Sequence, residues 1–417
     1  METHGIDPAS SGLGGNVEKR LFLARLALSR FRNYAEATLA PGPASVVLTG
    51  DNGAGKTNIL EAVSMLSPGR GLRGATFADM APLGGDGAWA VSARLSVDGE
   101  ETAIGTGQQP APGNMGGQGG AGSASRIVKI DGETMSGSGA LGEYVQILWL
   151  IPAMDGLFTG PASDRRRFLD RMAAAFDSSH RTRLTHFERA MRQRNRLFEM
   201  GERSARYFEA IEAQMAEIAT AIAAGRIEAM DRLAAHIAAS TRVDNAFPHA
   251  VLALEGVLEA DLRDTPAVDV EDAYARQLGQ FRERDRAAGR TLDGPHRSDL
   301  LVRHGPKDMP AHLSSTGEQK ALLIGLILAH AKAVKEAHAG LAPLLLLDEI
   351  AAHLDELRRE ALFEEIERLG TQAWLTGTDA RVFAPLQDKA QFFTVANGTV
   401  TADGGSLATP LRQVRTG

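Results

Sequence analysis

The chain has 417 residues, a formal net charge of -7 and no cysteine. The absence of cysteine excludes a disulfide-stabilised secreted module and any zinc or iron–sulfur site with cysteine ligands. With 43% hydrophobic and 23% charged residues, the composition also excludes a collagen-like or wholly disordered chain. The length suggests about two or three domains. The negative charge argues only weakly against nucleic-acid binding, because total charge says nothing about its distribution.

The two ends of the chain are expected to be tails. Residues 1–16 are polar and rich in Gly and Ser, and they lack the apolar core of a signal peptide. Residues 401–417 are assigned to a second tail. The longest apolar stretch, 321–329, is too short to span a bilayer. We therefore expect a cytoplasmic protein without a membrane segment.

The N-terminal part combines strand and helix patterns. A helix is predicted after residue 55, because Ile59, Leu60, Val63 and Leu66 fall on one face. The Gly-rich residues 105–125 cannot pack a core and predict a flexible loop. Strands are predicted where the chain is alternating, β-branched or continuously apolar, at residues 22–28, 45–48, 89–97, 126–130 and 144–151.

The pattern changes near residue 161. Residues 161–290 carry Ala, Arg, Glu, Leu and Met at helical spacing, which predicts an all-helical lobe. Strand and helix patterns then alternate again, at residues 321–334, 344–347, 356–369 and 373–376. The sequence therefore predicts one α/β domain, residues 17–160 and 291–400, that a helical insertion at 161–290 splits in two.

A phosphate-binding loop follows the second predicted strand. The segment GDNGAGKT fits the pattern GxxxxGK[ST] and lies between a strand and a helix, as the motif requires. The glycines let backbone N–H groups surround phosphate oxygens, and the helix N-terminus adds positive potential. The expected ATP-binding residues are Gly50, Asp51, Asn52, Gly53, Ala54, Gly55, Lys56 and Thr57. Lys56 is expected to reach the terminal phosphates, and the Thr57 hydroxyl to bind Mg²⁺.

A second glycine pattern, GSGALG at residues 137–142, matches the dinucleotide-binding motif GxGxxG. That motif requires a long helix after it. A predicted strand follows almost at once, so we interpret this segment as a turn.

Two acids end the apolar run 344–347. A buried parallel strand would deliver Asp348 and Glu349 to the sheet edge where the phosphate-binding loop also lies. Asp348 can then hold Mg²⁺, and Glu349 can polarise the attacking water, with Lys56 as the second catalytic residue. Upstream, Ser315 precedes an apolar helix, where the Ser-x-Gly turn can bind an anion and Ser315 can at the same time form a capping box with Glu318.

The order of these motifs is that of an ABC-type ATPase head, and the chain resembles the RecF family of bacterial recombination and gap-repair ATPases. The resemblance covers roughly residues 17–400. It rests on the segments RFRNY (30–34), GRGLR (69–73), RRRFLD (165–170), QRN (193–195) and TLDGPHRSD (291–299). The chain departs from the ABC pattern with Thr316-Gly317-Glu318 in place of Gly-Gly-Gln, and with Thr376-Gly377-Thr378-Asp379 where transporters place a switch histidine. It departs from many members of the RecF family with Pro152-Ala153-Met154-Asp155 in place of Pro-Glu-Asp.

The resemblance implies an ATP-dependent homodimer with Mg²⁺ and slow ATP hydrolysis used as a DNA-binding switch. It also implies partnership with RecR and RecO, and help in loading a recombinase at gapped DNA. In this family the signature of one protomer covers nucleotide bound to the other. The residues expected to act in trans are Ser315, Thr316, Gly317, Glu318, Gln319 and Asp355.

An arginine-rich segment of the predicted helical lobe indicates a DNA partner. Residues 163–206 contain 12 arginines and 6 acids, a net charge of +6 in an acidic chain. Such a segment suits phosphate-backbone binding, although a solvated helix face with ion pairs has the same composition. Arg297 either lines a DNA channel or caps a strand with its neighbour His296. The candidate DNA-binding residues are Arg189, Arg192, Arg194, Arg196 and Arg297.

Three other functions are weighed against this one. The ATP-binding subunit of a transporter would have only a compact helical subdomain between Lys56 and Gly317, and it would carry the switch histidine. A chromosome-structuring SMC protein requires heptads sustained over a long coiled coil, and the insertion is too short for one. A fused nuclease would need a further acidic cluster for two metals, which the sequence does not show.

Overall fold

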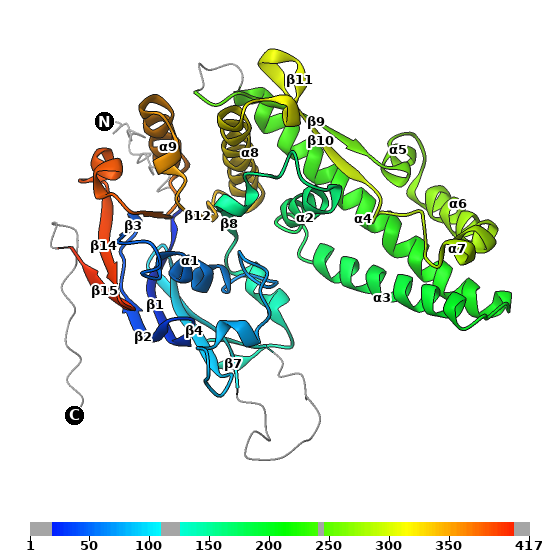
Figure 1. The fold of residues 1–417 in the computed structure, drawn as a ribbon, viewed down its shortest axis with the longest axis horizontal. Helices are drawn as coiled ribbons and strands as arrows, with labels where there is room; N and C mark the ends of the chain where they lie inside the picture. The colour runs from blue at the N-terminus through cyan, green and yellow to red at the C-terminus, as the bar shows by residue number, and fades with distance from the viewer. Residues whose placement is uncertain (1–18, 110–125, 241–245, 404–417) are drawn as a thin grey trace, which may run out of the picture.

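The computed structural model describes residues 19–109, 126–240 and 246–403 of the chain. These residues form an α/β head and an inserted arm of long helices that extends away from it (Figure 1). The predicted tail at 1–16 and most of the predicted tail at 401–417 lie outside the described residues. Residues 401 and 402 are not part of a tail, because they end a strand.

The head is centred on a six-stranded sheet of order β15-β14-β3-β13-β12-β8. All neighbours in this sheet are parallel except β14 and β15. Its strands are β3 (Ser45–Thr49), β8 (Ile147–Leu150), β12 (Leu344–Leu347), β13 (Ala373–Gly377), β14 (Ala390–Ala396) and β15 (Thr399–Ala402). The apolar runs of the sequence therefore form buried parallel strands, and the carboxyl ends of these strands lie at the same edge of the central sheet.

The central sheet is apolar on both faces because both are covered. Leu344 and Leu346 of β12 belong to the same core cluster as Ile59 of α1 (Lys56–Ser64). Leu345 and Leu347 point to the opposite face, because side chains alternate along a strand. They share a second cluster with the apolar residues of α8 (Thr316–Ala337) and α9 (Glu356–Leu369).

A second, antiparallel sheet of order β2-β1-β4-β5-β6-β7 covers α1. Its strands are β1 (Leu21–Phe31), β2 (Tyr34–Leu39), β4 (Trp89–Val97), β5 (Glu100–Gln108), β6 (Ile127–Ile130) and β7 (Glu133–Thr134). The predicted loop at 105–125 is wrong at its start, because residues 105–108 continue β5 and pair with β4. Residues 110–125 lie outside the described residues.

The insertion is mostly helical. It contains α2 (Ala162–Ala173), α3 (His180–Glu199), α4 (Ala205–Ser240), α5 (Val257–Asp264), α6 (Ala267–Gln280) and α7 (Arg282–Ala288). The prediction of an all-helical lobe is wrong in one respect. Strand β9 (Ala250–Glu255) lies within it and pairs antiparallel with β10 (Asp299–His304), which also pairs with β11 (Met309–Pro310). Strand β9 has the sequence AVLALE, in which burial alternates, but the helical composition around it hid this strand pattern.

The second glycine pattern forms no dinucleotide site. Residues Ser138–Glu143 make a 3₁₀ segment, and β8 begins at Ile147. The turn interpretation is therefore confirmed, since no long helix follows the glycines.

Candidate nucleotide-binding site

The phosphate-binding loop connects the end of β3 with the start of α1. Gly50, Gly53 and Gly55 have φ angles of 143°, 79° and 114°, which disfavour any residue with a side chain. Gly50 is further constrained by packing, because a Cβ there would lie 2.1 Å from the backbone oxygen of Val395. The glycines are therefore required by the conformation of the loop as well as by access for phosphate.

Lys56 begins α1 and folds back over the loop. Its Nζ donates to the backbone oxygens of Gly50 and Asp51, at 2.6 and 2.8 Å. Burial lowers the pKa of Lys56, while the charges of Glu349 and Asp348 oppose this shift. A lysine in this position can exchange neutral carbonyl partners for charged phosphate oxygens, which form stronger hydrogen bonds.

The FRNY segment packs beneath the loop. The Tyr34 hydroxyl donates to the Gly55 oxygen at 3.1 Å, and Asn33 Nδ2 donates to the Ala54 oxygen at 3.3 Å. Asn58 of α1 donates to Asn33 Oδ1 at 2.7 Å. The sequence alone assigned no role to the FRNY segment. In the structure, Asn33 and Tyr34 hold the phosphate-binding loop in place.

A buried carboxylate ties α1 to the same segment. Glu61 is fully buried and accepts two bonds from Arg32, at 2.8 and 2.7 Å. Arg73 donates to Glu61 at 2.9 Å and to Asn58 at 2.7 Å. The charge of Glu61 is thus matched by two arginines, one from each of the RFRNY and GRGLR segments.

The two predicted metal ligands are in contact. Thr57 Oγ1 donates toward the Asp348 carboxylate, at 2.9 and 3.1 Å from its two oxygens. A hydroxyl and one carboxylate fit the Mg²⁺ site of a phosphate-binding loop, where phosphate oxygens and waters complete the shell. The described residues contain no cluster of three or more His, Asp or Glu side chains that could hold a metal ion.

Thr376 holds both acids and was not predicted as a site residue. It ends β13, next to β12, and its hydroxyl donates to Asp348 Oδ1 at 2.8 Å. The Thr376 hydroxyl oxygen also accepts the Glu349 N–H at 2.9 Å. Glu349 has a φ angle of 54°, which is unfavourable for a residue with a side chain and is commonest at functional sites. In the sequence, the only sign of this role is that Thr376 lies near the end of the apolar strand that pairs with β12.

The predicted signature starts α8. Ser315 Oγ accepts the Glu318 N–H at 3.4 Å, and the Glu318 carboxylate accepts the Ser315 N–H at 3.1 Å. The capping-box interpretation is therefore confirmed. Lys307 also donates to Glu318, and this bond lowers the pKa of Glu318 to about 2. Gln319 is buried and donates to the Ser314 oxygen at 2.8 Å, so it supports the turn from inside.

The predicted nucleotide-binding residues fall into two groups, of which the structure brings only the first together. Residues 50–57, Asp348 and Glu349 form one site at the carboxyl edge of the central sheet. Ser315, Thr316 and Gly317 are exposed, as is Asp355, which caps α9 by accepting the Arg358 N–H at 2.9 Å. Among the described residues, no hydrogen bond or ion pair joins residues 50–57 to residues 313–320.

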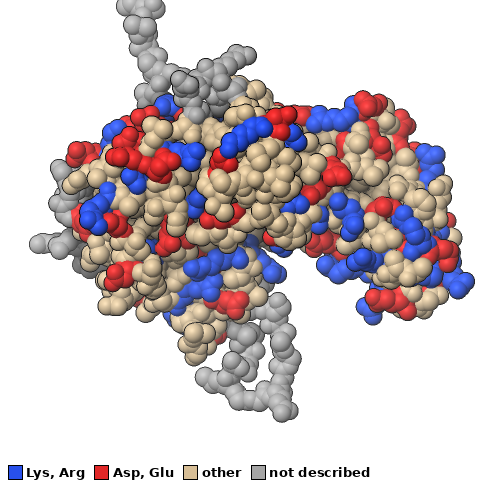
Figure 2. Space-filling model, turned by 45° about the horizontal axis from the view of Figure 1, so that its top comes forward, with Lys and Arg blue, Asp and Glu red and all other residues tan. Residues whose placement is uncertain are grey.

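The candidate DNA-binding arginines divide in the same way. Arg189, Arg192 and Arg196 lie exposed along α3, and Arg297 is exposed after the GPH turn. Arg194 is fully buried, so its assignment to the DNA surface is wrong. Figure 2 shows Lys and Arg side chains on both sides of the hollow between the head and the arm.

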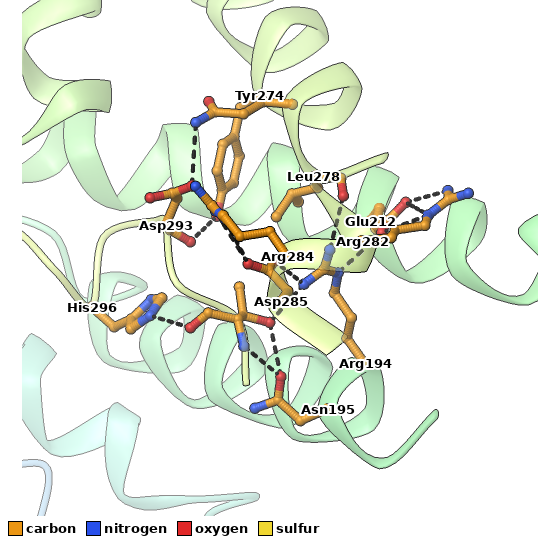
Figure 3. Close-up of polar contacts among 12 residues, drawn as sticks. Arg194, Asn195, Glu212, Tyr274, Leu278, Arg282, Arg284, Asp285, Asp293 and His296 are labelled. Carbon is orange, nitrogen blue, oxygen red and sulfur yellow. Dashed lines mark hydrogen bonds and ion pairs between the residues drawn. The ribbon is translucent and has the colours of Figure 1, made fainter. Parts of the chain in front are cut away.

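Arg194 instead belongs to a buried polar network that joins α3, α4 and α6 to the chain before β10 (Figure 3). It bonds to Glu212 at 3.0 Å, Asp285 at 2.7 Å, Thr291 at 2.9 Å and the Leu278 oxygen at 2.8 Å. The neighbouring Asn195 accepts both the N–H and the hydroxyl of Thr291, each at 2.9 Å. The QRN and TLDGPHR segments therefore meet inside the insertion, where they have a structural role.

His296 lies at the edge of this network. Its Nε2 is 3.2 Å from the Thr291 oxygen, its ring packs against Phe187, and burial lowers its pKa. The two residues of this pair therefore differ. His296 contacts protein groups and stabilises the turn, whereas Arg297 is exposed to solvent.

In the described parts of the chain, no helix combines the length and apolar character that crossing a bilayer requires. No protein-family model matches the chain. Curated relatives match nearly its whole length. The chain is 53% identical over 380 residues to the DNA replication and repair protein RecF of Mesorhizobium japonicum, covering 91% of this chain and 97% of the relative. It is equally 53% identical over 384 residues to the protein of the same name from Brucella suis biovar 1, covering 92% and 96%.

Solved structures share the fold. A structure of the recombination mediator protein RecF, described as RecF-ATP in the RecFOR pathway, matches with a TM-score of 0.78 at 20% identity. The match covers 92% of this chain and 98% of that one. The Smc head domain from Pyrococcus furiosus matches with a TM-score of 0.50 at 17% identity, over 92% of this chain and 96% of that one. Both confirm the predicted ABC-type α/β head.

Proposed function

Because the chain belongs to the RecF family of DNA replication and repair proteins, we propose that it is an ATP-gated dimer that clamps DNA at gaps or junctions. Its role would be to help a mediator complex load a recombinase there. The observation that carries the proposal is the convergence of Lys56, Thr57, Asp348 and Glu349 at one sheet edge, with the signature exposed for a second copy.

ATP would occupy the loop at residues 50–57. The loop N–H groups and Lys56 bind its phosphates, and bound Mg²⁺ would neutralise charge on the β- and γ-phosphate oxygens. Thr57 and Asp348 would hold that metal. The two residues are already within hydrogen-bond distance, so the site needs little rearrangement to accept it.

Hydrolysis would be slow. Glu349 would orient and polarise water at the γ-phosphate, and its backbone N–H donates to the Thr376 hydroxyl oxygen. A histidine does not follow β13, so no imidazole contacts the γ-phosphate from that position. Slow hydrolysis suits a switch, because the ATP-bound state then lasts long enough to hold DNA.

The dimer would complete the site in trans. Ser315 and the Gly317 N–H would bind the γ-phosphate held by the other protomer, and Asp355 would cross the same interface. Two exposed leucines support an interface there. Leu313, just before the signature, and Leu357, just after Asp355, are 62% and 72% exposed. Large apolar side chains beside polar motifs are typical of protein–protein contacts.

DNA would be held by its phosphate backbone. Arg189, Arg192 and Arg196 are exposed at spacings of three and four residues on α3, which places them along one face. Arg297 presents a further exposed guanidinium. Contacts of this kind depend on salt and carry little sequence preference. RecR and RecO are proposed as the mediator partners on the family resemblance, supported by the naming of the RecFOR pathway for the solved RecF.

A fluorescence-anisotropy assay with gapped, duplex and single-stranded DNA tests the proposal. We expect tight binding with ATP and weak binding with ADP or without nucleotide. Lys56→Ala should remove the ATP effect, and Glu349→Gln should prolong the ATP-bound complex. Arg94→Gln, an exposed arginine of β4 paired with Glu101, is a matched control that should behave as wild type. Equal DNA affinity in all nucleotide states would refute the proposal.

A further inference from the structure

A cavity of about 650 Å³ lies where the insertion meets the head. Its head side is the GRGLRG loop at 69–74 and the end of β8, and its other side is α2. Its lining contains four arginines, Arg70, Arg73, Arg167 and Arg171, and one acid, Asp164. None of residues 50–57 lines it, so the cavity is separate from the nucleotide site.

The positive charge of this cavity is poorly compensated. Asp164 is already paired with Arg167, and Arg73 with Glu61. Arg70 and Arg171 have no carboxylate within ion-pair distance among the described residues. Of these two, Arg70 is exposed and Arg171 is partly buried. A cation that leaves water is normally paired, because burial without a partner is costly, so the missing partner matters most for Arg171.

Arg171 is the most enclosed of the four. Its guanidinium lies over the rings of Trp149 and Phe168, 4.6 and 5.3 Å from their centroids. Its one hydrogen bond among the described residues is to the Met154 sulfur at 3.6 Å, a weak acceptor. Burial and the charge of Arg181 lower the pKa of Arg171 to about 9.

Trp149 forms one wall of the same cavity. It is 5% exposed, and its ring faces the Arg171 guanidinium. Because neither Arg70 nor Arg171 has a carboxylate partner among the described residues, an anion with several oxygens would find two guanidinium groups to bind.

The loop that forms the head side suits such an anion. Gly69, Gly71 and Gly74 all have positive φ, at 100°, 68° and 64°. Arg126, which donates to the Gly69 and Ser67 oxygens, adds charge behind the loop. Arg181 of α3 lies close to Gly69 as well. Arginines from both the head and the insertion thus converge on one short segment.

We propose that this cavity is a second phosphate-binding site, which holds a phosphate group between the GRGLRG loop and α2. The phosphate can come from a nucleic-acid backbone or from a free phosphate, since both present the same oxygens to the guanidinium groups. If it is a backbone phosphate, the site deepens the proposed function by anchoring DNA at the junction of head and arm. Arg73 of the GRGLRG loop donates to Asn58 of α1. A ligand in the cavity would therefore also affect the position of α1 beside the nucleotide site.

The test uses the full chain with Lys56→Ala, so that the nucleotide loop contributes no phosphate signal. Inorganic phosphate is titrated against chloride at constant ionic strength, with Trp149 emission and thermal stability as the two measurements. We expect a saturable change in emission and a rise in Tm, because a ligand that binds only the folded state stabilises it. Trp149→Phe should lose the emission change and keep the rise in Tm.

Arg171→Gln should weaken phosphate binding at least about tenfold, as expected for loss of a charge-assisted contact. Should this variant fail to fold, Arg70→Gln carries the same test, because Arg70 is exposed at the cavity. Arg94→Gln, with the same loss of charge elsewhere, should bind as before. Unaltered phosphate affinity in both Arg70→Gln and Arg171→Gln would overturn the proposal.

A second arm identifies the source of the phosphate. A short single-stranded oligonucleotide is compared with the same strand carrying neutral methylphosphonate linkages. Trp149 signals from the charged strand alone assign the site to nucleic acid, and signals from inorganic phosphate alone assign it to a free anion; either supports the site. A response to neither ligand would overturn it. Equal DNA affinity of the wild-type chain with and without ATP would instead refute the proposed function and leave this site standing.

Discussion

Replacing Arg194 tests whether this arginine stabilises the fold, although the sequence grouped it with the candidate DNA-binding residues. Its side chain is fully buried and reaches Glu212 and Asp285, which are 2% and 1% exposed. Removing one member of a buried ion pair typically costs about 3–5 kcal/mol. Arg194→Gln also leaves the Thr291 hydroxyl and the Leu278 oxygen without their donor.

Two neighbours limit that loss. Glu212 keeps its ion pair with Arg282, and Asp285 keeps Arg284 at 3.1 Å. We therefore expect the low end of the range, a decrease of about 3 kcal/mol in the free energy of unfolding of the insertion. Urea denaturation followed by circular dichroism at the helical minimum measures it, since most of the insertion is helical.

Arg192→Gln is the matched control. It removes the same charge from the same helix, but Arg192 is 67% exposed and its partner Glu188 is 3.6 Å away. We expect a change in stability below about 0.5 kcal/mol, together with weaker DNA binding and a smaller salt slope. The reasoning would be refuted if Arg194→Gln kept wild-type stability, or if Arg192→Gln destabilised the fold as much as Arg194→Gln.

Three further predictions concern the head. Thr376→Val removes the hydroxyl that Asp348 accepts from and should lower ATP hydrolysis by about tenfold or more, as a single-turnover assay would show, with less effect on ATP affinity. Gly50→Ala should abolish ATP binding in calorimetry, because the added Cβ collides with the backbone of β14; retained binding would contradict the packing argument. The Glu318 carboxylate has a pKa lowered to about 2, so its capping contribution to α8 should persist below the ordinary carboxylate range and be lost as pH falls toward 2. Lys307→Met should raise that pKa, measured by carboxyl NMR; an unchanged titration would exclude the lysine as the main cause.

The fold was largely predictable because its strongest signals are local. The run 344–347 and the helix 356–369 have the bounds that the sequence predicted. Continuous apolar runs of four to five residues are typical of parallel strands buried on both faces. Strand β9 was missed because its partner β10 is about 45 residues away in the chain, and no local pattern records that pairing.

Arg194 could have been separated from its neighbours by helical spacing. It falls in register with Phe187, Ala190 and Phe198, which are also buried on α3. Arg189, Arg192 and Arg196 share a different face. Counting arginines along a segment measures composition, whereas their spacing on a helix decides which of them reach solvent.

The supports of the nucleotide site could not be found by pattern alone. Asn33 and Tyr34 are about 20 residues before the loop that they hold, and Thr376 is 27 residues after the Glu349 backbone that it bonds. These contacts depend on how β1, β2 and β13 are placed around α1. The proposed metal ligands, Thr57 and Asp348, could be picked out because Thr57 lies in the first turn of the helix after the glycine loop and Asp348 directly follows a continuous apolar run.

Mixing two inactive variants tests the composite site most directly. Lys56→Ala removes the phosphate-binding lysine and keeps the signature, while Ser315→Arg does the reverse. If nucleotide sites form between two copies, each variant alone should lack ATP hydrolysis and ATP-dependent DNA binding. An equal mixture should recover about a quarter of the wild-type hydrolysis, because half of the dimers are mixed and each has one intact site. A mixture as inactive as its components, from variants that each still fold, would contradict a site shared between protomers.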